Sequence, residues 1–318
     1  MIAYLVRRLL LAALTVVIMS FLVFGSIRIV PGKAVDLLLA NTGAATPAER
    51  QDLEQKLGLS GPIWQQYGTW VGNLARGDLG KSVFSDQPIG PQVKRYLPVT
   101  LELGLMSMAM STILGLALGV FAAVKHGSFW DFSSTSVGVA MLSIPGYWIA
   151  TLIIGYGAVY FGWTPPLIYV PFRDDPLANL GQFWLPALLM SFSTAGVLMR
   201  LTRTTMLEVL RQDYIRTARA KGLGSFVVTW RHALRNAIVP VITMIGIYLG
   251  FVLGSTVIFE QIFALPGIGR YMIQSINSRD YPAVQAVAIV VATFVVIINL
   301  VVDIAYGVID PRIRYGSS

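Results

Sequence analysis

The spacing of the charged residues is the feature that most constrains the fold of this chain. Six long runs carry no Asp, Glu, Lys or Arg: Leu9–Ile27, Leu103–Val124, Phe132–Phe172, Pro176–Met199, Ile238–Phe259 and Tyr281–Val302. A helix that crosses a bilayer needs about 20 mainly apolar residues, so five of these runs fit one crossing each. In the longest run, the prolines at 165, 166 and 171 break a helix, which leaves one crossing near Ser134–Phe161. The sequence therefore predicts an all-α integral membrane protein with six membrane-spanning helices.

The composition agrees with a membrane protein and excludes several kinds of site. Only 13% of the residues are charged, against about 25% in soluble domains. The chain has no cysteine and only two histidines, His126 and His232, so we expect no metal site and no cofactor. It also lacks a Gly-x-x-x-x-Gly-Lys-Ser/Thr loop and any paired carboxylates or nucleophile–base set. We therefore expect a protein that is not an enzyme and does not itself bind ATP.

Basic residues predict the orientation in the membrane. Arg7 and Arg8 precede the first apolar run, which we interpret as a signal anchor that is not cleaved. With the N-terminus inside, most Lys and Arg outside the long first loop fall on the inner side. Both termini are then cytoplasmic, and the net charge of +8 faces the anionic headgroups of the phospholipid membrane. Nucleic-acid binding is not expected.

Three parts of the chain differ in character. We predict a signal-anchor helix at 1–30, a small extracytoplasmic subdomain at 31–98 and a five-helix transmembrane core at 99–318. In the subdomain, Thr46 suits the N-cap of a helix that ends near Leu57, and a second helix covers Ile63–Leu74. Arg76–Gly80 is typical of a turn. The subdomain either covers the helix bundle or receives an external solute receptor.

Glycines and one proline mark special positions within the predicted crossings. Small residues four apart let helices approach closely in lipid. This pattern occurs at Gly115 and Gly119, and again at Gly246, Gly250 and Gly254. Pro145 stands in the middle of the third crossing and predicts a kink there.

The loop Arg200–Asn236 is the longest predicted cytoplasmic segment. Within it, Asp213 suits an N-cap and Gly222 suits the left-handed residue that follows a helix, so we predict a helix of about eight residues. A helix this short is unstable alone, so something must pack on it. It is either an amphipathic connector on the headgroups or a peg that docks into a cytoplasmic motor protein, with small Ala218 and Ala220 permitting close approach. Ser225 then suits the N-cap of a second helix.

The same loop carries a resemblance to a known family. Asp213-Tyr214-Ile215-Arg216-Thr217-Ala218-Arg219-Ala220-Lys221-Gly222, followed by His232-Ala233-Leu234-Arg235-Asn236-Ala237, resembles the EAA loop of ABC-importer permeases in the dipeptide/oligopeptide/nickel branch. Arg216 stands where the general pattern has Glu. Further stretches that look like this branch are Gly77–Ser82, Pro266–Gly269, Arg279–Pro282 and Asp310–Arg312.

The resemblance implies a fold, a function and partners. The fold would be that of a type I ABC importer permease with a small helical extracytoplasmic insertion after the first helix. The chain would be the first permease of a heterodimer in the bacterial inner membrane. Its partners would be a second homologous permease, two ATPases that hydrolyse ATP, and an extracytoplasmic substrate-binding protein. The cargo would be dipeptides or oligopeptides, moved by alternating access, with glutathione, nickel chelates or another small solute as alternatives.

Two other functions fit the sequence less well. A proton- or sodium-coupled transporter needs ionisable groups in mid-membrane, and the centres of the predicted crossings have none. A membrane scaffold has no use for a capped cytoplasmic helix with small residues.

Candidate site residues follow from the resemblance and from the residue types. The ATPase-coupling helix comprises Asp213, Tyr214, Arg216, Thr217, Ala218, Arg219, Ala220, Lys221 and Gly222. Loop anchors are Arg200, Arg203, Arg231, His232, Arg235 and Asn236. Of these, Arg200 and Arg203 would bind either phosphates or the partner loop. An outer gate or receptor contact, with a surface turn as the alternative, comprises Glu260, Phe263, Pro266, Gly267 and Gly269. Residues that line the pore, or else serve helix packing or backbone hydrogen bonds, are Ser143, Tyr147, Trp148, Ser191 and Ser193.

Overall fold

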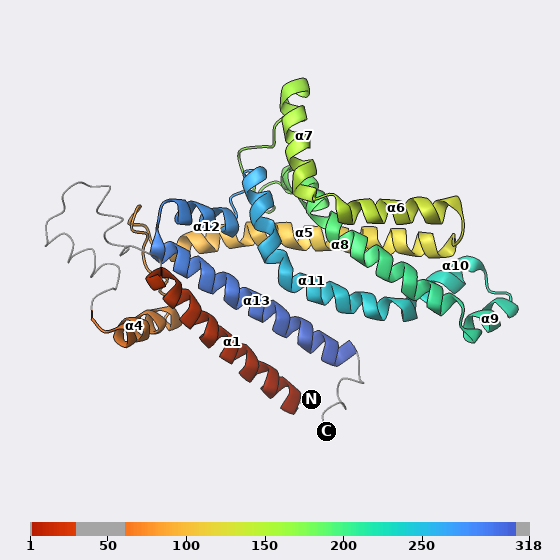
Figure 1. The fold of residues 1–318 in the computed structure, drawn as a ribbon, viewed down its shortest axis with the longest axis horizontal. Coiled ribbons are helices and arrows are strands. Elements are labelled where there is room, and N and C mark those ends of the chain that lie inside the picture. Colours follow the sequence, from red (N-terminus) through yellow and green to blue (C-terminus); the bar gives the residue numbers. More distant parts are fainter. Residues whose placement is uncertain (1, 30–60, 310–318) are drawn as a thin grey trace. The chain divides into compact units, whose positions relative to one another are not determined.

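A computed structural model describes residues 2–29 and 61–309 of the chain, and these residues are helical throughout apart from turns and loops (Figure 1). The helices are α1 (Ile2–Ile29), α4 (Ile63–Ala75), α5 (Ile89–Val124), α6 (Phe129–Ser143), α7 (Gly146–Phe161), α8 (Pro176–Leu210), α9 (Asp213–Ala220), α10 (Ser225–Val227), the π-helix η1 (Val228–Ala233), α11 (Leu234–Ile262), α12 (Ile268–Asn277) and α13 (Tyr281–Ile309). The predicted all-α class is confirmed. The helix predicted from Thr46 to Leu57 and the stretch Asp310–Arg312 lie outside the described residues.

Among the described residues, five helical segments are long and apolar enough to cross a membrane. They are Val6–Ser26 of α1, Ile89–Val124, Pro176–Leu210, Ser225–Ile262 and Tyr281–Ile304. The remaining predicted crossing, near Ser134–Phe161, consists of two helices rather than one, because α6 and α7 meet at an angle of 86°. If this bent pair counts as one broken span, the described residues hold six spans, as predicted.

Pro145 explains the break between α6 and α7. The residue before a proline is driven out of the helical region, and Ile144 accordingly has an extended backbone with ψ 117°. Pro145 is also extended, with ψ 125°, and α7 begins at the next residue. The kink predicted at this position is therefore present, but it is much sharper than a bend within one helix.

The described helices belong to two compact units, one formed by residues 1–99 with 266–318 and the other by residues 100–265. In the first unit α1 packs along α13, and Arg8 Nη1 lies 2.6 Å from Asp303 Oδ2. Helix α4 confirms the predicted helix at Ile63–Leu74. It rests on α1, where the Tyr67 ring stacks on Phe21 with centroids 4.2 Å apart.

A buried aspartate joins two distant segments of the first unit. Asp280, at the start of α13, accepts hydrogen bonds from the Ser82 hydroxyl and, at 3.3 Å, from the Val83 N–H. Ser82 and Asp280 are both buried. These two residues come from Gly77–Ser82 and Arg279–Pro282, two of the stretches that carry the family resemblance, so the resemblance here reflects a structural contact.

Helix α8 is the centre of the second unit, where α6, α7 and α11 pack on it. Helix α5 reaches it through two glycines. A methyl group at Gly115 would lie 2.6 Å from Leu198 Cβ, and one at Gly119 would lie 2.6 Å from Thr202 Cβ and 2.7 Å from the Met199 carbonyl oxygen. The predicted close approach at this pair of glycines is thus seen in the structure.

Glycines also set two further contacts in this unit. A methyl group at Gly146 would meet the Leu189 carbonyl oxygen at 2.1 Å, so α7 begins directly against the α8 backbone. In the second predicted glycine run, Gly246 is buried within the unit, whereas a methyl group at Gly254 would meet nothing within 4 Å. The run therefore has no close contact at Gly254 within the described chain.

We predict that Gly119→Ala destabilises the second unit. The new methyl group would clash with the α8 backbone, and overpacking of this kind costs about 1–3 kcal/mol. The melting temperature of the purified protein in detergent should fall. The control is Gly155→Ala on α7, where a methyl group meets nothing within 4 Å and where alanine raises helix propensity by about 1 kcal/mol. Equal melting temperatures for the two variants would contradict the tight contact of α5 with α8.

Candidate functional site

Helix α9 matches the helix predicted from Asp213 to Gly222 in length and position. It ends in a Schellman motif, in which the Leu223 N–H donates to the Ala218 carbonyl at 3.3 Å and the Gly222 N–H donates to the Arg219 carbonyl at 2.9 Å. Gly222 has the expected left-handed backbone, with φ +81°. The predicted N-cap is wrong by one residue, because Gln212 occupies that position and Asp213 is the first helical residue.

A buried cluster holds α9 against the ends of longer helices. We call it the loop cluster, and it comprises Val120, Ala123, Met206, Ile215, Ala218, Val228, Ala233 and Ala237. Ile215 is 0% exposed and Ala218 is 8% exposed. The expectation that Ala218 lets a partner approach is therefore wrong, because Ala218 packs against the chain's own helices. Its small size instead permits α9 to lie close to η1.

The opposite face of α9 is polar and exposed. We call it the α9 outer face, and it comprises Arg216, Thr217, Arg219, Ala220 and Lys221, all exposed. Arg216 Nη1 lies 3.4 Å from Asp213 Oδ1, but both side chains are largely in solvent, so this ion pair stabilises little. The outer face thus presents basic side chains on a helix whose other side is anchored.

The segment after α9 continues without a break into the α11 span. Gly224 is the N-cap and Ser225 the first helical residue, so the predicted cap at Ser225 is wrong. The π-helix η1 follows at once. The rings of Phe226 and Trp230 lie 6.1 Å apart and share a face, as predicted for this stretch. Because π-turns often mark functional sites, η1 is a candidate functional position between α9 and α11.

The predicted loop anchors have different environments. Asn236 Nδ2 donates to the Tyr214 hydroxyl at 2.7 Å, which ties α11 to α9. Arg231 and Arg235 are exposed and His232 is half-buried. Arg200 is exposed on α8. Arg203 differs from these anchors, because it forms an ion pair within its own chain.

Arg203 binds a buried aspartate of its own chain. Its Nε donates to Asp131 Oδ1 at 2.7 Å and its Nη2 donates to Asp131 Oδ2 at 2.9 Å. His126 Nδ1 lies 3.1 Å from the same carboxylate, and the Gly127 N–H donates to it at 3.0 Å. Both predicted roles of Arg203, a phosphate contact or a contact to a partner loop, are thus replaced by an intramolecular one. The pair holds the start of α6 to α8.

The segment predicted as an outer gate is buried. In the second unit Glu260 is 0% exposed and its Oε1 accepts a hydrogen bond from the Thr100 hydroxyl at 2.6 Å, while Phe263 is also buried. In the first unit Gly267 and Gly269 are buried at the start of α12, and Pro266 is half-buried. The alternative of an exposed surface turn is therefore wrong. The role as a gate or receptor contact stays a prediction.

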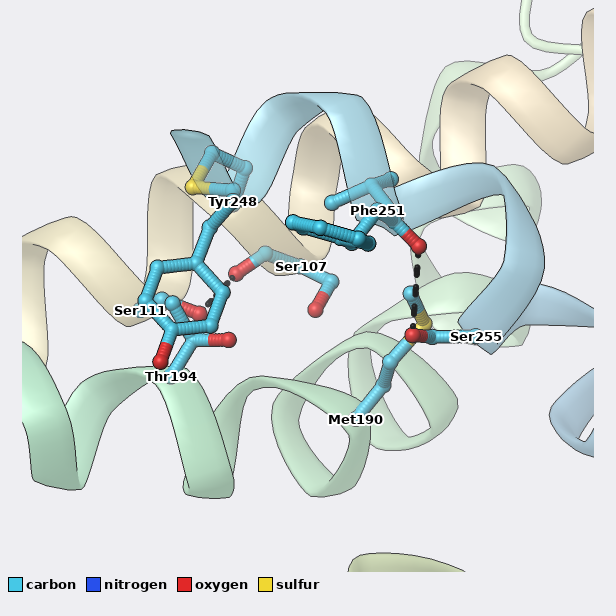
Figure 2. A pocket seen from close by; sticks show the side chains of 9 residues that line it. Ser107, Ser111, Met190, Thr194, Tyr248, Phe251 and Ser255 are labelled. Carbon is cyan, nitrogen blue, oxygen red and sulfur yellow. Dashed lines mark hydrogen bonds between the residues drawn. The ribbon is translucent and has the colours of Figure 1, made fainter. Parts of the chain in front are cut away.

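A small hollow lies between α5, α8 and α11 in the second unit (Figure 2). We call it the inter-helix hollow. It has a volume of about 40 Å³ and is lined by Ser107, Met108, Ser111, Met190, Thr194, Tyr248, Phe251, Val252 and Ser255. Two of its hydroxyls are engaged, since Ser111 donates to the Ser107 carbonyl at 2.8 Å and Ser255 donates to the Phe251 carbonyl at 3.4 Å.

The inter-helix hollow contains none of the five residues that were predicted to line the pore. Ser191 is buried and donates to the Leu188 carbonyl at 2.6 Å. Ser143, Tyr147 and Trp148 lie at the junction of α6 and α7, and Ser193 is exposed on α8. The five are not gathered at one place, so their role in a pore stays a prediction.

The sequence did carry a signal for the hydroxyls of the hollow. Ser107 and Ser111 are four residues apart, and Tyr248 and Ser255 are seven apart, so each pair stands on one face of an apolar helix. Within the described ranges, no group of three His, Asp or Glu side chains could hold a metal ion.

Comparisons with known proteins show that the sequence of this chain is similar to those of transport proteins. Residues 115–315 match the family described as binding-protein-dependent transport system inner membrane component, and residues 1–104 match its N-terminal counterpart. The dipeptide transport system permease protein DppB of Alkalihalophilus pseudofirmus is 38% identical over 99% of this chain and 100% of its own length. DppB of Escherichia coli K12 is 37% identical, with 99% of each chain covered.

Two solved structures share the fold. The inward-facing MetNI methionine ABC transporter gives a TM-score of 0.51 at 18% identity and covers 68% of this chain and 94% of its own. An amino acid ABC transporter with histidines gives a TM-score of 0.52 at 14% identity, covering 69% and 94%. At these identities the likeness supports the type I ABC importer permease fold and nothing more specific.

We predict that Arg203→Met lowers the melting temperature of the purified protein. It leaves the Asp131 carboxylate buried without its guanidinium, and breaking a buried ion pair costs about 3–5 kcal/mol. Because Arg203 is itself 26% exposed, we expect the lower end of this range. Arg200→Met, on the same helix but exposed, is the matched control and should melt like the wild type. If Arg203→Met melts like this control, the pair does not hold α6 to α8.

Proposed function

The chain belongs to the family of inner-membrane components of binding-protein-dependent transport systems, and from this membership we propose that it forms the membrane pore of an ABC importer for peptides. Its relatives named as dipeptide permeases support peptides as the cargo, with glutathione or nickel chelates as the alternatives. The chain is not catalytic in this proposal. Hydrolysis of ATP belongs to partner subunits.

The observation that carries the proposal is the two-sided construction of α9. Ile215 and Ala218 anchor the helix in the loop cluster, while the α9 outer face keeps Arg216, Arg219 and Lys221 exposed. Exposed basic side chains on an anchored helix suit a docking surface for another protein, because charge complementarity speeds and orients association. We infer that an ATPase subunit binds the α9 outer face.

The anchoring explains how docking would drive transport. A push on α9 acts on Val228 and Ala233 of η1 and on Ala237 of α11, all members of the loop cluster. Because η1 and α11 are continuous, the movement passes directly into the α11 span. The passage then opens alternately to the two sides of the membrane. Packed helices transmit such a displacement, because a close-packed contact switches between discrete arrangements and does not deform gradually.

The remaining partners follow from the family name and from the charges. We propose a heterodimer with a second, homologous permease, two ATPases, and a separate extracytoplasmic binding protein that delivers the solute. Both termini and α9 face the cytoplasm, in keeping with the excess of Lys and Arg there. Residues 31–98 form the extracytoplasmic subdomain between the anchor helix at 1–30 and the transmembrane core at 99–318.

We predict that Arg219→Glu weakens ATPase binding. Reversing a charge on the α9 outer face should reduce co-purification of the ATPase subunits about tenfold or more, equivalent to about 1.4 kcal/mol of binding free energy. Arg173→Glu is the control. It reverses a charge that is also exposed, in the loop before α8, which the proposed topology puts on the other side of the membrane. If the Arg219→Glu variant co-purifies with the ATPase subunits as the wild type does, the proposed docking role of α9 is refuted.

We predict that α9 is labelled from the cytoplasmic side only. The chain has no natural cysteine, so Lys221→Cys introduces a single thiol on an exposed position. A membrane-impermeant maleimide should modify it in inside-out vesicles and not in intact cells. Labelling in intact cells would place α9 outside and refute the proposed coupling to ATP hydrolysis.

A further inference from the structure

Three hydroxyls in the inter-helix hollow have no hydrogen-bond partner among the residues that the structure describes. They belong to Ser107 on α5, Thr194 on α8 and Tyr248 on α11, so each comes from a different helix (Figure 2). Tyr248 extends from α11 toward α8, the helix that carries Thr194. The two other hydroxyls of the hollow, from Ser111 and Ser255, donate to backbone carbonyls.

Free hydroxyls are unusual at such a position. Within membrane helices a serine or threonine commonly satisfies itself by donating to the carbonyl four residues earlier, as Ser111, Thr112 and Ser143 do here. Ser107 is only 3% exposed and does not do so. Thr194 and Tyr248 are half-buried, and none of the three hydroxyl oxygens is fully enclosed by the described residues. Each can therefore take a water molecule or a polar solute as its missing partner, which removes the cost of an unpaired polar group.

The lining of the hollow defines which solute groups it suits. None of its nine residues carries a charge, and Met108, Met190, Phe251 and Val252 supply an apolar remainder. A site of this kind does not favour ammonium or carboxylate groups. It suits neutral groups that both donate and accept hydrogen bonds, and methionine adapts to apolar groups of varied shape.

The size and openness of the hollow fit a passage rather than a storage site. A volume of about 40 Å³ holds about three water molecules, at 10–15 Å³ each, and is too small for a peptide. Phe251 is 68% exposed and Ser255 is exposed, so the α11 side of the lining is not enclosed by the chain. A displacement of α11 away from α5 and α8 would widen the hollow, and α11 is the helix that α9 contacts through the loop cluster.

We propose that Ser107, Thr194 and Tyr248 form a subsite on the solute path that hydrogen-bonds the backbone amides of a passing peptide. The proposal rests on the proposed function as a peptide importer. Backbone amides occur in every peptide, whatever its side chains, so a neutral triad of hydroxyls would bind many sequences alike. Each neutral hydrogen bond contributes only about 0.5–1.5 kcal/mol, which keeps the solute weakly held and releasable.

The test uses the whole transporter, with its second permease, ATPases and binding protein, in proteoliposomes. ATP-driven uptake of labelled dialanine is compared for wild type, Ser107→Ala, Thr194→Val and Tyr248→Phe. Each variant should lower the kcat/KM of uptake about 2- to 12-fold, the loss of one neutral hydrogen bond. Ser255→Ala is the matched control, because it removes a hydroxyl of the same hollow that is already bonded to its own helix.

A second measurement separates hydrogen bonding from a structural effect. Uptake of dialanine is compared with uptake of the analogue methylated at its amide nitrogen, which lacks the amide donor. The binding protein is unchanged throughout, so its own preference cancels when the ratio of the two uptakes in a variant is divided by the ratio in wild type. The preference for the unmethylated peptide should shrink in at least one of the three variants and persist in Ser255→Ala.

The outcomes distinguish the two proposals. If the wild type imports dialanine and the three variants match Ser255→Ala in rate and in peptide preference, the amide subsite is refuted and the importer function stands. If the wild-type transporter shows no ATP-driven dialanine uptake, the proposed function falls, and the subsite falls with it.

Discussion

Close contact between helix backbones on α8 is the interaction on which the rest of the second unit depends. In lipid the hydrophobic effect does not drive helices together, so association relies on packing. Gly115 and Gly119 bring α5 onto α8 and Gly146 brings α7 onto it. These contacts leave no room for a methyl group and so fix the helices at one register. Two of the three helices that line the inter-helix hollow, α5 and α8, are held together in this way.

In the loop Arg200–Asn236, one face of α9 is anchored and the other is exposed. The residues that fix α9, Ile215 and Ala218, point into the loop cluster, while the basic residues point away from it. Helix α6 has its own attachment at the end of α8, through Asp131 and Arg203. In the proposed coupling, a movement of α9 would meet the packed helices of the loop cluster on one side and a continuous helix, η1 with α11, on the other. This arrangement favours transmission over local deformation, because packed contacts yield as units.

If the inter-helix hollow lies on a solute path, as we propose, its neutral polar lining would bind a solute only weakly. Charged groups in a span are expensive and would hold an oppositely charged solute tightly. Hydroxyl groups cost less and can serve as donor or acceptor. Ser107, Thr194 and Tyr248 supply such groups from three helices that need not move together. In our proposal, a displacement of α11 would change the distances from Tyr248 to Ser107 and Thr194 and so release a bound amide.

Patterns along the chain determined the spans and the end of α9. Those features depend on local physics: apolar length for the spans, and the left-handed residue Gly222 for the end of the helix. The resemblance in the loop also led directly to the family. The positions of single caps, Asp213 and Ser225, were wrong by one residue, because a cap depends on the exact turn of the backbone.

Only the tertiary structure decided which way residues face and what they touch. Ala218 is buried because the loop cluster gathers residues from Val120 to Ala237, a contact that no local pattern contains. Arg203 binds Asp131, 72 positions away in sequence, and the 86° break at Pro145 separates α6 from α7. The free hydroxyls of the hollow come from three helices distant in sequence. Periodicity in the sequence predicts on which face of its own helix a residue lies. The residue that it contacts depends on how the other helices pack, and no local pattern predicts that packing.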